Sequence, residues 1–311
     1  MDTYSDRYER ITLHIGAHRT GSSSVQAALH IARADLAQSG LDIVAPQVAD
    51  ARHVTDHRPL LNRYLAAYDK QRQKSFAGRI LSAPSLRKTT RMYLEQTSGQ
   101  NKELLWSDEN ILGRAVEASA PGVLYPEVRG RLEALERLAG RNVDRVILTI
   151  RTYDEFLVSY EAMRQAYGDG GIGFDNLESW STRNLQGWTS VVDAVQEVFG
   201  NASIEICFFS KFLVSERFNK LTGRKLSEKH AAEANDLVNI APTKEALHAL
   251  SSLKTSNALT KQEIDQLLLD HRNGHRFQSK EIFSSDFLDF LQSQYLEDTQ
   301  EILRIPGLVT E

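Results

Sequence analysis

Residues 13–26 read Leu13-His14-Ile15-Gly16-Ala17-His18-Arg19-Thr20-Gly21-Ser22-Ser23-Ser24-Val25-Gln26. An apolar run over residues 11–15 ends at a glycine, and a helical spacing of apolar residues begins at Val25. This order predicts a strand, a glycine-bounded loop and a helix N-terminus, where backbone N–H groups and the helix dipole favour an anion. We interpret residues 16–24 as a phosphate-binding loop, although two glycines between a strand and a helix also occur in turns that bind nothing.

The side chains of this loop suit an anion in different ways. Gly16 and Gly21 allow the backbone to curl tightly. The serines that follow can cap the helix and donate hydrogen bonds to phosphate oxygens. A Walker A loop would carry lysine directly after its last glycine, but serine stands there, and the cation of this loop is Arg19.

The composition is that of an ordinary globular protein. The chain has 311 residues, of which 41% are apolar and 25% charged, and its net charge is −4. This charge gives no reason to expect nucleic acid or an anionic membrane as a partner, so any basic site must be local. No apolar run is long enough to span a bilayer, and residues 1–10 lack a signal-peptide core. The single cysteine, Cys207, lies in an apolar strand pattern, so we expect a buried thiol in a soluble, cytoplasmic protein.

Apolar, β-branched runs alternate with amphipathic helical patterns along the chain. The runs span residues 11–15, 41–45, 103–106, 145–150 and 203–209. Beyond residue 236 only helical patterns follow. We therefore expect a single α/β domain over residues 1–311. It would be a P-loop-containing three-layer sandwich with a central, mostly parallel five-stranded sheet, helices on both faces and a helical C-terminal portion from residue 236.

Residues 47–102 form the least readable region, because they are polar and lack a clear period. The ordinary interpretation is a solvated helix or loop. A lid over the ligand crevice is the alternative, since insertions after the carboxyl edge of a sheet lie over that crevice. His53 and His57 have the i,i+4 spacing of metal ligands on a helix, but no acidic or cysteine partner follows closely, so we expect no metal site.

The fourth run ends directly before Arg151, at the position where a strand meets a helix. Thr152 and Glu155 have the Thr-x-x-Glu spacing of a capping box, which would start that helix. Ser159 lies about two turns into it. An arginine fork binds a phosphate with two parallel hydrogen bonds and a hydroxyl adds a third, so Arg151 and Ser159 are candidate anion ligands.

The third run ends in adjacent carboxylates, Asp108 and Glu109. The carboxyl ends of parallel strands meet at one edge of a sheet, so both side chains are expected beside the loops described above. A carboxylate in such a crevice can act as a general base. One of the pair can instead anchor the loop, and the sequence does not decide which.

Residues 13–29 resemble the 5′-phosphosulfate-binding loop of sulfotransferases that use 3′-phosphoadenosine 5′-phosphosulfate (PAPS). The family loop reads Lys-Thr-Gly-Thr-Thr, commonly after Gly-x-His in bacterial members. This chain departs from it at Arg19, which keeps the charge of lysine but not its shape, and in having serines for threonines. Residues 145–160 resemble the family's 3′-phosphate-binding motif. The nucleotide-binding residues that the resemblance implies are Gly16, His18, Arg19, Thr20, Gly21, Ser22, Ser23, Ser24, Arg151 and Ser159.

The resemblance also implies a reaction, the transfer of a sulfuryl group from PAPS to a hydroxyl of a carbohydrate or small metabolite, with no metal required. Glu109 is then the candidate general base, with Asp108 as its alternative. Arg19 would balance charge on the leaving phosphate. The Arg-Lys-Gly motif near the C-terminus of cytosolic animal members is not found, and the basic loop 272–276 is a candidate to replace it over the nucleotide.

Three functions therefore stay open. The first is a PAPS-dependent sulfotransferase. The second is a P-loop kinase or NTPase in which residues 104–109 form a Walker-B-like strand, but the missing lysine disfavours it. The third is a nucleotide-binding protein that has kept the fold and lost turnover, for which Arg19 in place of lysine is the best support.

Overall fold

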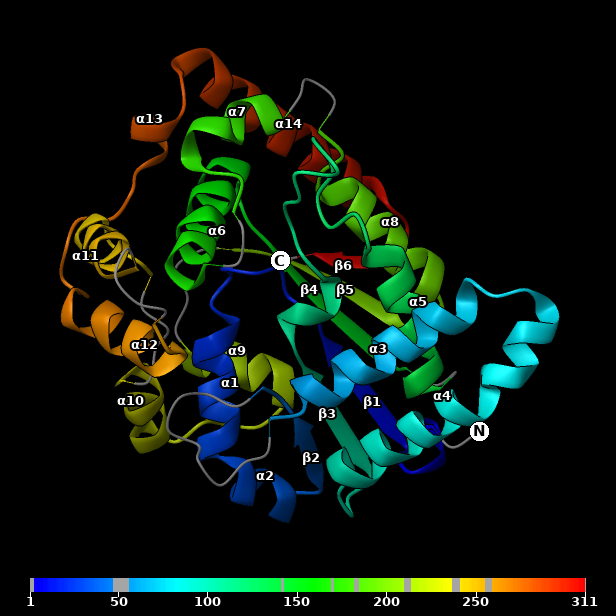
Figure 1. Ribbon diagram of the computed structural model, residues 1–311. Helices are drawn as coiled ribbons and strands as arrows, with labels where there is room; N and C mark the ends of the chain where they lie inside the picture. The colour runs from blue at the N-terminus through cyan, green and yellow to red at the C-terminus, as the bar shows by residue number, and fades with distance from the viewer. Residues whose placement is uncertain are drawn as a thin grey trace.

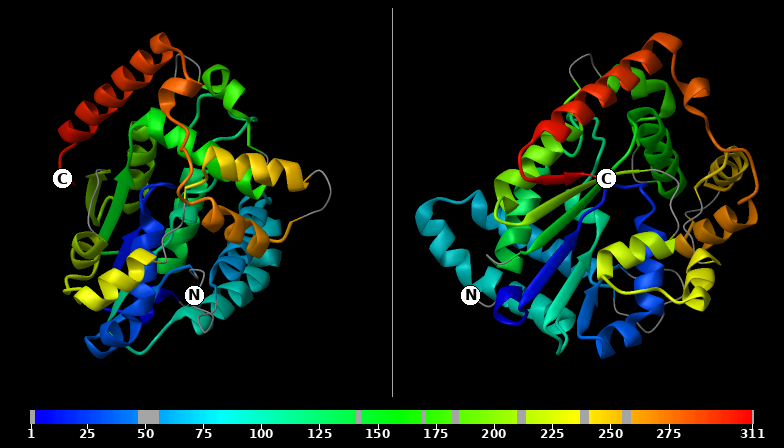
Figure 2. Two further views of the ribbon diagram at one scale, coloured as in Figure 1. Left: turned by 90° about the vertical axis from the view of Figure 1, so that its left-hand side faces the viewer. Right: turned by 180° about the vertical axis from the view of Figure 1, so that it is seen from behind.

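The computed structural model describes residues 3–46, 56–140, 143–168, 171–181, 185–209, 214–236, 241–254 and 259–310. These residues form a six-stranded sheet in the order β2-β3-β1-β4-β5-β6, and each neighbouring pair is parallel. The strands are β1 (Arg10–His14), β2 (Leu41–Val44), β3 (Glu103–Ser107), β4 (Arg145–Ile150), β5 (Ser203–Phe208) and β6 (Leu308–Thr310). Figure 2 shows the sheet from behind, with β2 in blue near one edge and β6 in red at the other.

The expected α/β class with a parallel sheet is confirmed, and each of the five expected strands is present. The expected number of strands is wrong, because β6 adds a sixth beside β5. The C-terminal portion is therefore not purely helical. β6 has only three residues and follows Gly307, whose φ is +82°. A run this short has no recognisable period, and only its pairing with residues 204–206 defines it as a strand.

Helices cover both faces of the sheet (Figure 1). One face is covered by α1 (Ser22–Ile31), α2 (Arg33–Gln38), α9 (Val214–Thr222) and α10 (Glu228–Asp236). The other is covered by α3 (Arg58–Arg72), α4 (Phe76–Thr97), α5 (Val128–Ala139), α8 (Trp188–Phe199) and α14 (Ser285–Arg304). The remaining helices are α6 (Tyr153–Tyr167), α7 (Leu177–Trp180), α11 (Lys244–Lys254), α12 (Lys261–Asp270) and α13 (Ser279–Ile282). Of these, α11, α12 and α13 pack against α6.

Side chains of the strands alternate between two hydrophobic clusters, because successive residues of a strand point to opposite faces. Toward α3, α5 and α8 the strands present apolar side chains, such as the fully buried Leu13 and Trp106. Toward α1 and α9 the strands are apolar in the middle of the sheet but polar at their carboxyl ends. There His14, Ser107 and Thr149 are all buried. The floor under the loop after β1 is therefore polar.

The strand order predicts a crevice beside β1, which lies between β3 and β4. After β1 the chain enters α1 on one face, whereas after β4 it enters α6, whose Phe156 and Leu157 belong to the cluster on the other face. A parallel sheet opens a crevice at its carboxyl edge where neighbouring connections leave toward opposite faces. The loops after β1, β3 and β4 border this crevice.

The polar region after β2 is a hairpin of two helices rather than an irregular loop. Within it, α3 and α4 pack against each other, and Leu61, Tyr64 and Tyr93 are buried in the core. α4 contains Pro84 inside the helix. The hairpin begins near the carboxyl edge of the sheet and extends away from the body of the protein (Figure 1, cyan). Residues 47–55, which would belong to a lid, lie outside the described residues.

The structure bears on two expectations, a buried Cys207 and the absence of a membrane-spanning segment. Cys207 is 2% exposed in β5, so the expected buried thiol is confirmed. Among the described residues, no helix combines the length and apolarity needed to cross a bilayer.

A buried carboxylate fastens α14 to the centre of the molecule. Asp298 accepts hydrogen bonds from the backbone N–H of Trp188, at 2.8 Å, and from the Tyr153 hydroxyl. The ring of Tyr153 stacks on that of Trp188. The Trp188 indole N–H donates in turn to the carbonyl oxygen of Arg151, at 2.7 Å. A helix near the end of the sequence thus holds the backbone at the end of β4.

Gly187 lies where this network leaves no room for a side chain. A Cβ atom there would overlap the Tyr153 hydroxyl and lie 2.6 Å from Oδ2 of Asp298, and both neighbours are buried. We expect Gly187→Ala to lower the free energy of unfolding by about 1–3 kcal/mol, measured by urea denaturation. Ser190→Ala, at an exposed position of α8, is the control and should change it by less than about 0.5 kcal/mol. Equal effects of the two variants would contradict this packing.

Candidate functional site

The loop between β1 and α1 contains two residues in the left-handed region, Gly21 with φ +77° and Arg19 with φ +66°. Glycine adopts this conformation freely, but for Arg19 it is strained and must be held by neighbours. Gly16 meets a different need. A Cβ atom there would lie 3.2 Å from Nε2 of His14 and 3.3 Å from the Thr20 hydroxyl. Gly21 thus supplies the left-handed conformation, and Gly16 leaves room for the neighbouring side chains of His14 and Thr20.

The serines do not cap α1 as the sequence suggested. Gly21 is the N-cap residue, no side chain caps it, and Ser22, Ser23 and Ser24 form the first turn instead. The Thr20 hydroxyl is used inside the loop, where it donates to a carbonyl oxygen three residues earlier at 2.6 Å. Within the described part of the chain, the Ser22 and Ser24 hydroxyls and the Gly21 and Ser22 N–H groups have no hydrogen-bond partner. The N-terminus of α1 therefore presents free donors to the crevice.

The two predicted anion-binding segments are in direct contact. Nε of Arg19 donates to the Ser159 hydroxyl at 2.9 Å. Nη1 of Arg151 donates to the carbonyl oxygen of Arg19, also at 2.9 Å. The structure therefore brings Arg19, Arg151 and Ser159 together, and Arg151 helps to hold the strained backbone of the loop.

The capping box predicted at the start of α6 is wrong. Thr152 is the N-cap residue, but its side chain caps nothing, and its buried hydroxyl has no partner among the described residues. Glu155 instead accepts from Nε and Nη2 of Arg151, at 3.0 and 2.9 Å. A charged guanidinium four residues earlier attracts the carboxylate more strongly than a backbone N–H does. The Arg151 guanidinium also lies 4.8 Å from the ring centre of Phe209.

Positive charge accumulates around Arg19. Burial, followed by the repulsion of Arg151, lowers the pKa of Arg19 to about 10, so its side chain stays protonated at neutral pH. Arg276 contributes to the same lowering. Arg276, in the basic loop 272–276, is therefore near enough for its charge to act on Arg19. That this loop covers a nucleotide stays a prediction.

The carboxylates after β3 have different surroundings. Asp108 is fully buried, and it accepts from Nη2 and Nε of Arg58, at 2.8 and 3.1 Å, and from the Asn110 N–H at 3.0 Å. His57 lies beside it, with Nε2 at 3.4 Å from Oδ2. Burial lowers the pKa of His57, so this ring is neutral at neutral pH. Asp108 is thus inaccessible to solvent, and its hydrogen bonds hold the loop after β3 in place.

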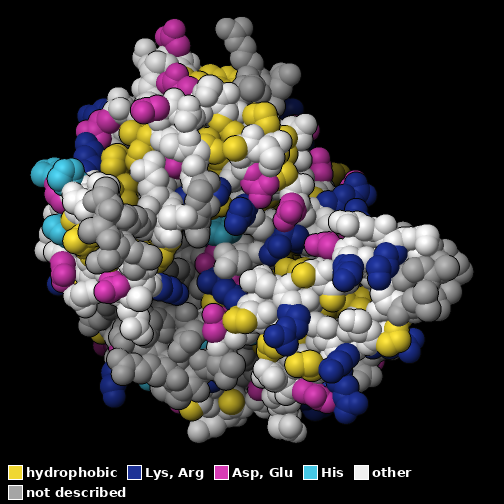
Figure 3. Space-filling model, in the orientation of Figure 1, with side chains coloured by type: hydrophobic (Ala, Val, Ile, Leu, Met, Phe, Trp, Pro, Cys, Tyr) yellow, Lys and Arg dark blue, Asp and Glu magenta, His cyan; other side chains and the backbone are white. Residues whose placement is uncertain are grey.

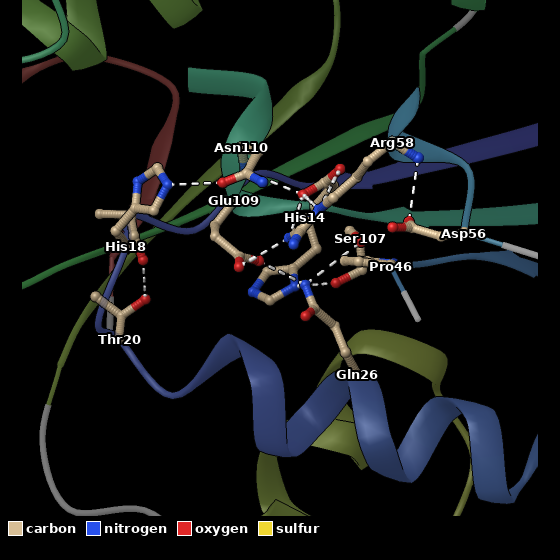
Figure 4. A network of polar contacts seen from close by, with 12 residues as sticks. His14, His18, Thr20, Gln26, Pro46, Asp56, Arg58, Ser107, Glu109 and Asn110 are labelled. Atoms are coloured by element: carbon tan, nitrogen blue, oxygen red, sulfur yellow. Dashed lines mark hydrogen bonds and ion pairs between the residues drawn. The ribbon is translucent and has the colours of Figure 1, made fainter. Parts of the chain in front are cut away.

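Glu109, in contrast, keeps 12% of its side chain exposed. Its oxygens pair with Nη2 of Arg58 at 2.9 Å and accept from Nε2 of Gln26 at 2.7 Å (Figure 4). Burial alone would raise the pKa of this carboxyl group, but Arg58, His18 and Gln26 together hold it well below its ordinary value. Glu109 is therefore ionised at neutral pH, and of the two carboxylates it is the one with a partly exposed side chain.

His18 connects the loop after β1 with the loop after β3. Its backbone N–H donates to the Tyr125 hydroxyl oxygen at 3.0 Å. Oδ1 of Asn110 can only accept, so the ring proton lies on Nε2, at 2.8 Å from that oxygen (Figure 4). Nδ1 of the neutral ring then accepts from the Tyr125 hydroxyl at 3.0 Å. Burial lowers the pKa of His18, which keeps the ring neutral. With both nitrogens used, His18 positions the loop and has no free lone pair for a substrate proton.

Sequence reasoning missed the partners that complete the site. Arg58 lies in the region without a period, so nothing local marked it. Gln26 carried a signal, since it is a polar residue on the sheet-facing side of α1 and is only 2% exposed. Tyr125 and Asn110 had no such signal. His53 lies outside the described residues, and within the described ones no three His, Cys, Asp or Glu side chains are placed to hold a metal.

Comparisons with known proteins find neither a family model nor a curated protein that matches this chain.

Arg58→Met tests the charge balance of this site. The variant leaves two buried carboxylates without their cation, and we expect a loss of about 3 kcal/mol in the free energy of unfolding at neutral pH. Because the fold lowers the pKa of Glu109 from 4.5, the pairing stabilises the protein above that pH and fades as the pH falls through the lowered pKa. The loss should therefore be smaller at about pH 3, as measured by urea denaturation at both pH values.

Arg91→Met is the matched control. Arg91 forms an exposed i,i+4 ion pair with Glu95, and its removal should cost less than about 0.5 kcal/mol. A loss for Arg58→Met that is equal at both pH values would mean that the cation does not balance Glu109.

Proposed function

We propose that this protein is a PAPS-dependent sulfotransferase that acts on a hydroxyl group of a carbohydrate or small metabolite. The resemblance of residues 13–29 and 145–160 to the phosphate-binding motifs of that family is the starting point. The observation that carries the proposal is the hydrogen bond from Arg19 to Ser159, at 2.9 Å. It joins two segments that are far apart in sequence, each proposed to bind a different phosphate of one nucleotide.

The donors of the crevice fit such a nucleotide. The free N–H groups of Gly21 and Ser22 and the hydroxyls of Ser22 and Ser24 suit the 5′-phosphate, and a helix N-terminus favours that charge. Arg151 and Ser159 suit the 3′-phosphate. Arg151 already pairs with Glu155, but that ion pair is partly exposed, and a doubly charged phosphate would compete well for the fork.

The proposed reaction needs a base and a cation. PAPS supplies the activated sulfuryl group. The acceptor hydroxyl loses its proton to Glu109 as its oxygen forms a bond to sulfur. The bond between sulfur and the 5′-phosphate oxygen breaks, and Arg19 balances the charge left on that phosphate. The products are a sulfate ester and adenosine 3′,5′-bisphosphate.

Glu109 is preferred as the base over the alternatives in the sequence. Asp108 is fully buried and held by Arg58. Both ring nitrogens of His18 are hydrogen-bonded. The same burial of Asp108 weighs against a P-loop NTPase, because a Walker-B aspartate must reach a magnesium ion.

Arg151→Ala tests the nucleotide site. We expect this variant to bind adenosine 3′,5′-bisphosphate more weakly by about 2–3 kcal/mol, because a charge-assisted fork is lost. Isothermal titration calorimetry without added metal measures the effect. Adenosine 5′-phosphate lacks the 3′ group, so its affinity should not change. An unchanged affinity for the bisphosphate would contradict the assignment of Arg151.

Glu155→Gln is the control for that experiment. It frees Arg151 from its ion pair without removing the guanidinium, so bisphosphate binding should stay equal or tighten. Weaker bisphosphate binding by Glu155→Gln would mean that the ion pair between Arg151 and Glu155, rather than an unpaired Arg151 guanidinium, maintains the site.

Glu109→Gln tests the chemistry. Glutamine keeps the size and hydrogen bonds of the side chain but cannot accept a proton, so turnover should fall by about 10²–10⁴-fold. Nucleotide affinity, measured in parallel, should be nearly unchanged. Undiminished sulfuryl transfer would remove Glu109 from the role of base. If the unmodified protein binds the bisphosphate but sulfates no hydroxyl acceptor, a nucleotide-binding protein without turnover becomes the better description.

A further inference from the structure

The hairpin of α3 and α4 is strongly basic, although the chain as a whole is acidic. Residues 58–97 contain nine Lys and Arg residues and only two acidic residues, whereas the whole chain has a net charge of −4. In Figure 3, Lys and Arg side chains lie along the surface formed by this hairpin, with few acidic side chains between them. An imbalance of this size over one supersecondary unit creates a local positive potential.

Four of these cations have no acidic partner among the described residues. They are Arg63, Lys70, Arg87 and Lys88, and all four are exposed. On α3, Arg63 and Lys70 are seven residues apart and so share one face, opposite the buried Leu61 and Tyr64. On α4, Lys88 faces away from the buried Leu86 and Tyr93. Packing of the hairpin does not require these four charges.

The helix that carries Arg63 and Lys70 begins at the candidate site. Arg58 is the first residue of α3, and its guanidinium binds both Asp108 and Glu109. From Arg58 to Lys70 the helix rises about 18 Å. A ligand that follows α3 would therefore have one end at Glu109 and the rest over the free cations.

The chemistry of the surface narrows the class of ligand. Single-stranded nucleic acids need exposed aromatic rings on which bases stack, but Tyr64 and Tyr93 are buried and Tyr68 is half-buried. A membrane surface needs exposed apolar side chains. The exposed large apolar residues of the described chain all lie outside the hairpin, and they are Leu253, Leu269, Leu296, Leu303 and Val309. Among the hairpin side chains that the structure describes, charge without stacking or apolar anchors suits a hydrated polyanion.

We propose that the hairpin of α3 and α4 binds an anionic carbohydrate chain and presents one of its hydroxyl groups to Glu109. This inference rests on the proposed function for the identity of the reaction, but not for the binding. A carbohydrate chain carries both the repeated anionic groups that match the four free cations and a hydroxyl on every sugar. The acceptor is then a polymer, and the hairpin is its docking surface.

The test compares two variants with the unmodified protein. In the first, Arg63, Lys70, Arg87 and Lys88 are all replaced by glutamine. In the matched control, four exposed lysines outside the hairpin are replaced by glutamine, and they are Lys225, Lys229, Lys261 and Lys280. The probes are fluorescently labelled dextran sulfate and uncharged dextran of the same length, with binding measured by anisotropy at low and high salt.

We expect the hairpin variant to bind dextran sulfate at least about tenfold more weakly at low salt, with a shallower salt dependence. The control variant should stay within about twofold, and uncharged dextran should bind none of the proteins. Affinity for adenosine 3′,5′-bisphosphate should be the same in all three, which shows that the fold and the nucleotide site are intact. Equal weakening by both variants, or none by the hairpin variant, overturns the proposal.

Two further probes separate the other partners. Polyuridylate, or vesicles of phosphatidylcholine and phosphatidylserine, would overturn the carbohydrate assignment if either bound more tightly than dextran sulfate and lost that binding in the hairpin variant. Failure of the proposed function gives a different pattern, in which dextran sulfate still binds through the hairpin but no protein transfers a sulfuryl group to any carbohydrate tested.

Discussion

Two adjacent carboxylates at the end of a buried strand require a cation, and Arg58 is that cation. Asp108 has no exposure and Glu109 little, so both charges would be costly without a partner. Arg58 binds them from a helix that lies far earlier in the sequence, and it thereby fixes the start of α3 at the carboxyl edge of the sheet. This guanidinium links the start of the basic hairpin to the loop after β3, and with His18 and Gln26 it keeps Glu109 ionised.

The fold was largely predictable because the strands are apolar, β-branched runs between helical patterns. Each of the five expected strands is present, and only β6, with three residues, was too short to recognise. The helix caps were predicted poorly, because residue spacing does not show which other groups compete for a capping side chain. Glu155 has the spacing of a capping residue, but it pairs with Arg151. The serines follow a glycine that takes the N-cap position in a left-handed conformation.

The candidate site was predictable in its parts but not in its connections. The loop at residues 16–24 and the Arg151 and Ser159 pair could each be identified from local sequence, since strand ends and glycine loops have local signatures. The hydrogen bond between Arg19 and Ser159 crosses from β1 to α6 and depends on strand order, which no local pattern contains. The role of Arg58 could not be predicted either, because its contacts with Asp108 and Glu109 also depend on how distant segments pack. Whether these residues bind a nucleotide stays a prediction.

The contact between Arg151 and the Arg19 backbone has a consequence for folding. The loop after β1 needs a left-handed residue that is not glycine, and one contact holding it comes from the end of β4, more than a hundred residues later. A partly folded chain without β4 has the loop sequence but not its conformation. The loop after β1 should therefore be among the last parts of the sheet edge to become protected from hydrogen exchange during refolding, even though α1, which it precedes, can form early.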